Sequence, residues 1–137
     1  MDYWEKCKYG IKFDKDIGIK PRIVCLCGSV RFEKEFKECA EAFHLSGDIV
    51  LMPVIFRHDE FHDSNTYMQS VKRDMDRVHK WKILMAELIF IIDKDGYIGE
   101  STQSEIEFAK SRGKWIAYMS EEGEMKNDCN TREFWVL

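Results

Sequence analysis

The sequence lacks the features that mark membrane, secreted and nucleic-acid-binding proteins. No apolar run is long enough to span a bilayer, and the first twenty residues are too charged for a signal peptide. The formal net charge is -4, with both signs mixed along the chain, so no basic stripe indicates binding to a nucleic acid polymer. Internal repeats and low-complexity segments are also missing. We therefore expect no membrane or nucleic-acid partner.

Cysteine is present in an odd number, five, which does not suit a closed set of disulfides. Cys25 and Cys27 lie two apart in a predicted strand, so they share one face and do not pair with each other there. We interpret them as reduced thiols in a cytoplasmic protein. The 137 residues, 45% of them hydrophobic, predict one domain with a substantial core.

Apolar runs alternate with segments of helical periodicity along most of the chain. The runs, which predict strands, are Arg22–Cys27, Ile49–Met52, Leu88–Ile92 and Trp115–Met119. Two apolar stripes at helical spacing lie between them: Phe32, Phe36, Cys39, Ala40 and Phe43, and then Met68, Val71, Met75, Val78 and Met85. This order predicts a single-domain α/β protein, Rossmann- or flavodoxin-like, with a mostly parallel sheet of four to five strands and flanking helices. We expect the α/β domain over 21–120, an N-terminal extension over 1–20 and a C-terminal tail over 121–137 that packs on the domain.

The stretch that follows the strand at 88–92 combines loop and helix signals with a carboxylate. Gly96 and Gly99 indicate a loop, Ser101 and Thr102 are candidate helix N-caps, and Glu105 then falls in the first helical turn. In open α/β sheets, ligands bind beyond the carboxyl ends of the strands, where this loop is predicted. Two roles remain open for Glu105: a group facing the ligand, or the second member of a capping box.

The turn Leu26-Cys-Gly-Ser-Val-Arg31 follows the first predicted strand of the domain. Ser29 can cap the next helix, and the free amides of its first turn together with Arg31 make a natural anion site. The turn has neither the glycine pattern of dinucleotide-binding folds nor that of a P-loop. A plain helix cap beside a surface arginine is the other interpretation.

Two clusters of polar residues offer further candidates. Asp76 and His79 lie one turn apart on the second predicted helix, either as site residues or on a solvated charged face. His58 and His62 are four apart, but Asp59 stands where a zinc-binding motif of this spacing has glutamate, and the segment lies in predicted loop. We therefore expect no metal site there.

Several of these motifs together resemble the nucleoside 2-deoxyribosyltransferase-like superfamily. They are Cys27-Gly-Ser-Val-Arg31, an Asp and His on the preceding helix, and Gly96-Tyr-Ile-Gly-Glu-Ser-Thr-x-Ser-Glu-Ile-Glu-x-Ala109, and the similarity covers roughly residues 22–119. The superfamily includes deoxynucleoside 5'-monophosphate N-glycosidases, which share a similar Cys-Gly-Ser-x-Arg turn. Two positions depart from its pattern: Cys25 stands where the transferases have tyrosine, and Ala86-Glu87 replaces Ala-Asp.

The resemblance implies a set of roles for individual residues. Glu105 matches the nucleophilic glutamate, and Asp76, or alternatively Asp74, matches the aspartate that contacts the sugar or base. The leaving base would be protonated by one of these aspartates or by a group from 56–63. Substrate binding would fall to Cys27, Gly28, Ser29, Arg31, His58, Gly99 and Ser101. Neither a metal nor an organic cofactor is implied.

The function expected from the resemblance is cleavage of the N-glycosidic bond of a nucleoside 5'-monophosphate or nucleoside, by hydrolysis or base transfer. Two alternatives are a non-catalytic nucleotide-binding or sensing protein and an enzyme acting on another N-ribosyl compound. The methionine-rich stripe of 68–85, with Trp81 beside it, indicates a homodimer or higher homo-oligomer, as does the family's assembly. The simpler interpretation is that this stripe packs on the sheet.

Overall fold

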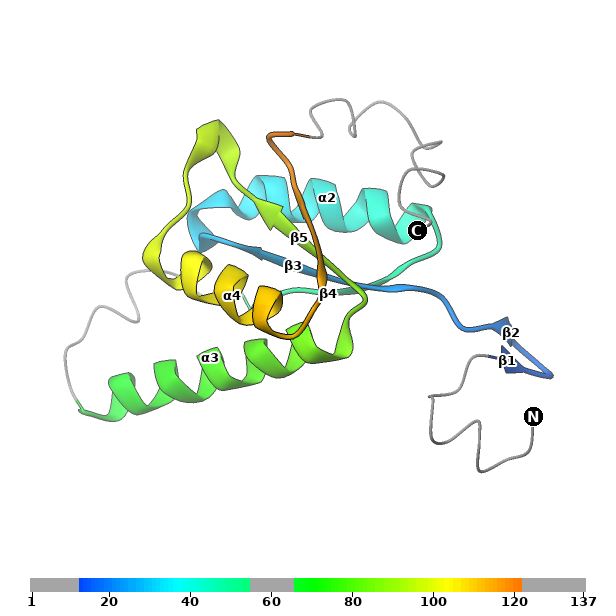
Figure 1. Ribbon diagram of the computed structural model, residues 1–137, viewed down its shortest axis with the longest axis horizontal. Coiled ribbons are helices and arrows are strands. Elements are labelled where there is room, and N and C mark those ends of the chain that lie inside the picture. Colours follow the sequence, from blue (N-terminus) through cyan, green and yellow to red (C-terminus); the bar gives the residue numbers. More distant parts are fainter. Residues whose placement is uncertain (1–12, 55–65, 122–137) are drawn as a thin grey trace.

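The computed structural model describes residues 13–54 and 66–121, and these form a three-layer α/β domain (Figure 1). The four-stranded sheet has the order β4-β3-β5-β6, and all its neighbours run parallel. Its strands are β3 (Ile23–Gly28), β4 (Ile49–Leu51), β5 (Leu88–Ile92) and β6 (Trp115–Tyr118). The predicted α/β class and parallel sheet are thus confirmed.

Helices cover both faces of this sheet. Helix α2 (Glu33–Leu45) lies on one face, while α3 (Thr66–Met85) and α4 (Glu100–Ser111) lie on the other (Figure 1). Two short 3-10 turns, η1 (Val30–Phe32) and η3 (Lys94–Gly96), follow the carboxyl ends of β3 and β5. Parallel strands require such crossovers, and the crossovers bury the sheet on both sides.

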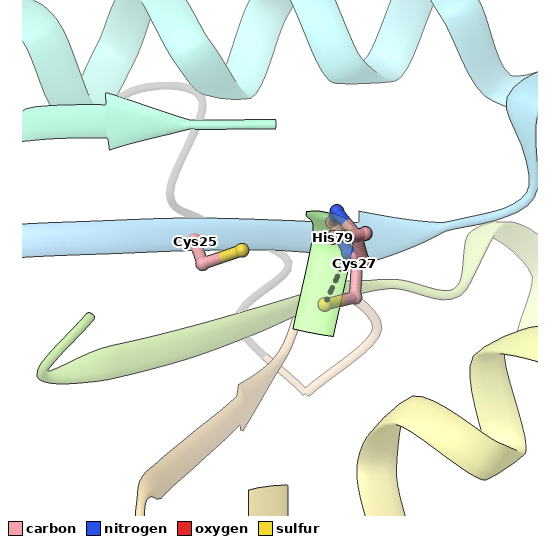
Figure 2. Close-up of side chains that lie close together, drawn as sticks. All are labelled: Cys25, Cys27 and His79. Carbon is pink, nitrogen blue, oxygen red and sulfur yellow. Dashed lines mark hydrogen bonds between the residues drawn. The ribbon is translucent and has the colours of Figure 1, made fainter. Parts of the chain in front are cut away.

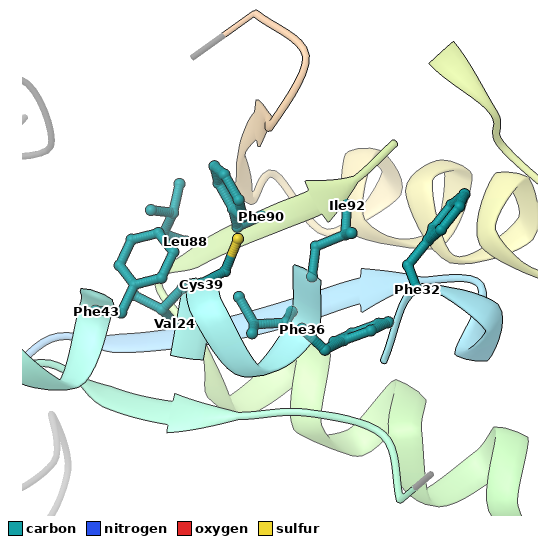
Figure 3. Packing of buried hydrophobic residues seen from close by; sticks show 9 residues of the cluster. Val24, Phe32, Phe36, Cys39, Phe43, Leu88, Phe90 and Ile92 are labelled. Carbon is teal, nitrogen blue, oxygen red and sulfur yellow. The ribbon is translucent and has the colours of Figure 1, made fainter. Parts of the chain in front are cut away.

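The face beneath α2 is built almost entirely from apolar side chains. Val24 and Leu26 of β3 alternate inward with Leu88, Phe90 and Ile92 of β5. They meet Phe36, Cys39 and Phe43, which recur at helical spacing along α2 (Figure 3). The rings of Phe43 and Phe90 meet edge to face with their centroids 5.1 Å apart. The helical stripe predicted for this segment is therefore confirmed.

The face beneath α3 and α4 has a different composition. Cys25 and Cys27 of β3 and Ile89 and Ile91 of β5 point to it, and they pack against Ile83, Ala86, Ile106 and Ala109. Both cysteines are free thiols and completely buried, as their shared face predicts. All five residues of β5 are buried because both of its faces are covered, which explains its continuous apolar sequence.

The order of the strands creates a switch point between β3 and β5. From β3 the chain passes to β4 on one side, and it then returns to form β5 on the other side. Crevices at such points, beyond the carboxyl ends of the strands, are the ligand sites of open α/β sheets. Gly28 closes β3 here, and a Cβ atom added to it would lie 2.8 Å from the backbone oxygen of Ile92. Only glycine allows the two strand ends to approach so closely.

The apolar stripe predicted for helix α3 is not the face that this helix buries. Val78 and Met85 are 54% and 59% exposed, whereas the buried side chains of the helix are His79 and Ile83. Val71 and Met75 are half-buried, and the side chain of Met68 lies outside the described ones. The helix therefore turns a partly polar face toward the sheet, which a search for apolar periodicity misses.

The remaining described segments lie at the margin of the domain. Strands β1 (Phe13–Asp14) and β2 (Gly18–Ile19) form a small antiparallel hairpin in the N-terminal extension, with Ile17 and Ile19 exposed. The predicted C-terminal tail lies outside the described residues except for Glu121. Of the described helices, none combines the length and the apolar content that crossing a bilayer requires.

Candidate active site

Glu105 projects from α4 toward β3 at the switch point. Its side chain is only 16% exposed, and its Oε2 atom lies 3.7 Å from His79 Nε2. Among the described residues, Oε2 has no hydrogen-bond partner although it is buried. A carboxylate is costly to bury in this way, so the position is unusual for a side chain with a purely structural role.

The start of α4 rules out the capping box as the role of Glu105. The N-cap is Gly99, and the helix begins at Glu100, so Ser101 and Thr102 lie inside the helix rather than at its cap. Glu105 consequently falls in the second turn, not the first, and no capping box exists. The amides of the first turn are left free for other partners, and the glutamate faces β3 instead.

His79 is the second buried polar group of the site. Its imidazole Nε2 lies 3.3 Å from Cys27 Sγ (Figure 2), and its Nδ1 has no hydrogen-bond partner among the described residues. Of the two alternatives considered for this segment, the solvated charged face is thus wrong for His79, which is 5% exposed. The nearby charges of Arg77 and Lys80 and the exposed Val78 hide this orientation in the sequence. Its spacing of four residues from Ile83 was the available signal.

The protonation states of this site depart strongly from those of exposed groups. Burial raises the pKa of Glu105 to about 7, opposed by a hydrogen bond from the Cys27 side chain. Burial, followed by the charge of Lys82, lowers the pKa of His79 to about 4. At neutral pH the His79 imidazole is therefore uncharged, and the Glu105 carboxyl group is present in both its protonated and its ionised form. Shifted groups of this kind concentrate at functional sites.

The two cysteines of β3 complete the inner wall of the site. Hydrogen bonding with Cys25 and then burial raise the pKa of the Cys27 thiol well above its ordinary value, so the thiol is protonated. The Cys25 thiol also lies 3.9 Å from the carbonyl oxygen of Leu26. A protonated thiol is a donor for Glu105 and a poorer nucleophile than a thiolate.

The turn after β3 carries the predicted anion-binding residues. The Ser29 hydroxyl accepts a hydrogen bond from the Arg31 amide at 3.4 Å and so caps η1, while α2 itself has no side-chain cap. The Arg31 guanidinium lies 4.2 Å from the centroid of the Tyr97 ring and donates to its hydroxyl at 3.2 Å. Tyr97 was not predicted as a site residue. It couples the turns that follow β3 and β5.

Asp76 is exposed, and it lines a groove of about 530 Å³ between α3 and α4. Its negative charge is one of the influences that raise the pKa of Glu105, whereas Asp74 has no such effect. This favours Asp76 over Asp74 as the second acidic group. The other residues lining the groove are Arg73, Arg77, Lys80, Trp81, Leu84 and Phe108.

The remaining predicted site residues that the structure describes lie at the ends of helices and strands. Gly99 is the N-cap of α4, and Ser101 is exposed in its first turn. Gly28 ends β3 beside Cys27. His58 lies outside the described residues. The described groups that meet closely are thus Glu105, His79, Cys27 and Cys25.

Comparison with known proteins adds no identity to this geometry. No protein-family model matches the chain, and no curated protein matches it significantly. Any function must therefore be inferred from the residues of the site and from the sequence motifs.

Proposed function

We propose that this protein cleaves the N-glycosidic bond of a nucleoside 5'-monophosphate or nucleoside, with Glu105 as the nucleophile. The observation that carries the proposal is the Glu105 carboxylate, which is largely buried at the switch point of the sheet without a hydrogen-bond partner for Oε2 among the described residues. The sequence resemblance to nucleoside 2-deoxyribosyltransferase-like proteins supports the same role.

Cleavage of this bond develops positive charge at the anomeric carbon of the sugar. The Glu105 carboxylate attacks C1' as the bond to the base nitrogen breaks, and the bonding electrons leave with the base. A covalent glycosyl-enzyme results, which water or a second base resolves. Burial suits this role because a carboxylate shielded from water interacts more strongly with the developing charge.

The departing base needs a proton or a hydrogen bond. Asp76 is the candidate group: its charge influences Glu105, and its side chain is open to solvent, from which it would take up the proton that it passes to the base nitrogen. The buried imidazole of His79 is uncharged, so it is poorly suited to donate this proton.

A substrate 5'-phosphate fits the turn after β3. Stacking on Tyr97 orients the Arg31 guanidinium, and the Ser29 hydroxyl lies at the Arg31 backbone amide in the same turn. Arg31→Ala should weaken nucleotide affinity by roughly 1.5–3 kcal/mol and leave nucleoside affinity nearly unchanged, because the lost bond is charge-assisted. Lys34→Ala, an exposed cation one turn further along, is the matched control. Calorimetric titration with both ligand types measures the difference, and an equal loss for both contradicts a phosphate site.

Free-base release is the direct test of the reaction. A panel of nucleoside 5'-monophosphates and nucleosides is incubated with the protein, and the released bases are separated by liquid chromatography. Glu105→Gln keeps the size of the side chain but removes the nucleophile, so turnover should fall at least ~100-fold. Glu107→Gln, an exposed position on the same helix, should retain the wild-type rate. Wild-type turnover by Glu105→Gln contradicts the assignment.

A nucleotide-binding or sensing protein is the second candidate. It is favoured by the replacement of the family's tyrosine by Cys25, a buried thiol that points into the same face as Cys27. Binding of a nucleotide without base release from any member of the panel identifies this case. Binding retained by Glu105→Ala together with loss of turnover identifies an enzyme.

We further propose that the chain forms a homodimer or a higher homo-oligomer through the outer surface of α3. Val78, Trp81 and Met85 are exposed at helical spacing on this surface, with Trp81 61% exposed. Light scattering at micromolar concentration should then give a multiple of 16.3 kDa. Trp81→Glu should lower this mass, whereas Trp115→Glu, at the start of β6, should not. A wild-type mass near that of one chain contradicts the assembly.

A further inference from the structure

Three side chains that bind metals converge beneath Glu105. Cys25 and Cys27 come from successive inward positions of β3, and His79 comes from α3 (Figure 2). Their ligand atoms all lie within 4.8 Å of one another, and all three residues are buried. Two thiols and one imidazole are the donor types that select zinc over magnesium or calcium.

Two distances around His79 match those between the ligands of one zinc ion. Bonds of roughly 2.0–2.3 Å to nitrogen, oxygen and sulfur place the corners of a tetrahedron about 3.3–3.8 Å apart. His79 Nε2 lies 3.3 Å from Cys27 Sγ and 3.7 Å from Glu105 Oε2. Cys25 Sγ lies within 4.8 Å of both Cys27 Sγ and the His79 ligand atom, so it must move by up to about 1 Å to reach the same spacing from these two groups. A χ1 adjustment supplies such a shift, at the loss of its contact with the Leu26 carbonyl.

The bonding of these groups also indicates a cation. Oε2 of Glu105 is buried without a hydrogen-bond donor among the described residues, and it points toward His79 Nε2. A bound cation compensates a buried carboxylate oxygen and an imidazole nitrogen at once. Zinc with two thiolates and one carboxylate carries a net charge of about -1. The charges of Lys80 and Lys82 act on this same site and oppose that excess.

We propose that Cys25, Cys27, His79 and Glu105 form a zinc site, with the two cysteines as thiolates. Binding releases to solvent the two thiol protons and any proton held by Glu105, so no oxidation or reduction is involved. Glu105 keeps a solvent-exposed edge, which gives the ion a path to the buried ligands. The chain offers the site without any residue from a second subunit.

The zinc site shares Glu105 with the proposed reaction, and only this consequence depends on the proposed function. A carboxylate bound to zinc is not free to attack C1', so the zinc-loaded protein should release no base. The metal-free protein should be the active form. Zinc would then act as a reversible inhibitor that competes with the nucleoside for one side chain.

Cobalt substitution tests the site by spectroscopy, independently of activity. The full chain is stripped with a chelator and titrated with Co²⁺ under reducing conditions, and Zn²⁺ is then added. We expect one equivalent of Co²⁺ to give thiolate-to-metal charge-transfer bands and the visible bands of tetrahedral cobalt, and Zn²⁺ to abolish them. The absence of charge-transfer bands in the wild-type protein overturns the proposal.

Single variants assign the ligands. Cys25→Ser, Cys27→Ser and His79→Gln should each weaken binding by more than about 100-fold, because even outer-shell partners are worth roughly 10–100-fold. Cys39→Ser removes a buried thiol on the opposite face of the sheet and is the matched control. Charge-transfer bands that persist in both Cys25→Ser and Cys27→Ser overturn the assignment, since other cysteines of the chain are then the ligands. Circular dichroism checks the fold of each variant. Glu105→Gln, at the exposed edge, should weaken binding without risk to the core.

Base-release assays with and without zinc separate the two proposals. Release by the metal-free chain that stops on addition of one equivalent of Zn²⁺ supports both. Release that continues in the zinc-loaded protein removes Glu105 from the ligand set. No release under any condition contradicts the proposed reaction, while the cobalt spectra still decide the metal site.

Discussion

The two faces of the sheet are buried to a similar degree but have different chemistry. Beneath α2, strands β3 and β5 present valine, leucine, isoleucine and phenylalanine to a phenylalanine-rich helix. Beneath α3 and α4, the same strands present two cysteines, which meet His79 and Glu105. A buried polar group without a hydrogen bond is a cost in free energy. The difference indicates that the α2 face supplies stability, whereas the other face gives up stability by burying polar groups.

The largest effect is expected from the α2 face. Phe36→Ala empties a completely buried position beneath the helix, so the free energy of unfolding should fall by about 3–5 kcal/mol. Leu45→Ala, at the exposed end of the same helix, should change it by less than about 0.5 kcal/mol. Urea titration followed by circular dichroism measures both variants. A loss below about 1 kcal/mol for Phe36→Ala means that this face does not provide the main stability.

A smaller effect is expected where the two faces meet at the end of β3. Gly28→Ala forces a methyl group against the Ile92 carbonyl, which is backbone and has little freedom to move. We expect a loss of about 1–3 kcal/mol in unfolding free energy. Gly99→Ala is the control, because its added Cβ meets only the Tyr97 side chain, nearest at its hydroxyl oxygen at 3.4 Å, and it should cost less than about 1 kcal/mol. Equal losses for the two variants contradict a special close approach at Gly28.

The smallest effect on stability is expected from His79→Leu in chelator-treated protein. Leucine has a similar size and removes a buried imidazole whose Nδ1 lacks a partner among the described residues. The unfolding free energy should therefore stay within about 1 kcal/mol of the wild-type value or rise. Ile83→Ala, one turn away on the same helix face, should cost about 2–5 kcal/mol. If His79→Leu costs as much as Ile83→Ala, then the polar face is as important for folding as its apolar neighbours.

The fold was predictable because burial leaves a strong trace in composition. A strand covered on both faces, such as β5, must be apolar throughout, and α2 shows one apolar side chain per turn. Helix α3 gave a misleading pattern because its buried face contains His79, while Val78 and Met85 face outward. Apolar periodicity reports only apolar burial.

The site was predictable only in part. The position of Glu105 followed from the strand, loop and helix order, but the helix begins earlier than expected because Gly99 is its N-cap and provides no side-chain signal. Tyr97 and His79 depend on contacts between segments far apart in the chain: Arg31 with Tyr97, and Cys27 with His79. Local spacing made His79 a candidate, but it does not encode the distance to Cys27, and no local pattern indicated Tyr97.

The pairing of β3 with β5 has a consequence for how the chain reaches its native state. The register that joins Val24 to Leu88 closes a loop containing α2, β4 and α3, so it carries a large loss of chain entropy. Contacts between residues so far apart in the sequence form slowly, because the loss of chain entropy comes before the stabilising contacts between the central strands are made. Cys27 lies in β3, and Glu105 lies in α4, which follows β5, so the two residues come together only when β3 and β5 pair. Helix α2 depends on local contacts and can form before this pairing, whereas the candidate site can be complete only after the two central strands have paired.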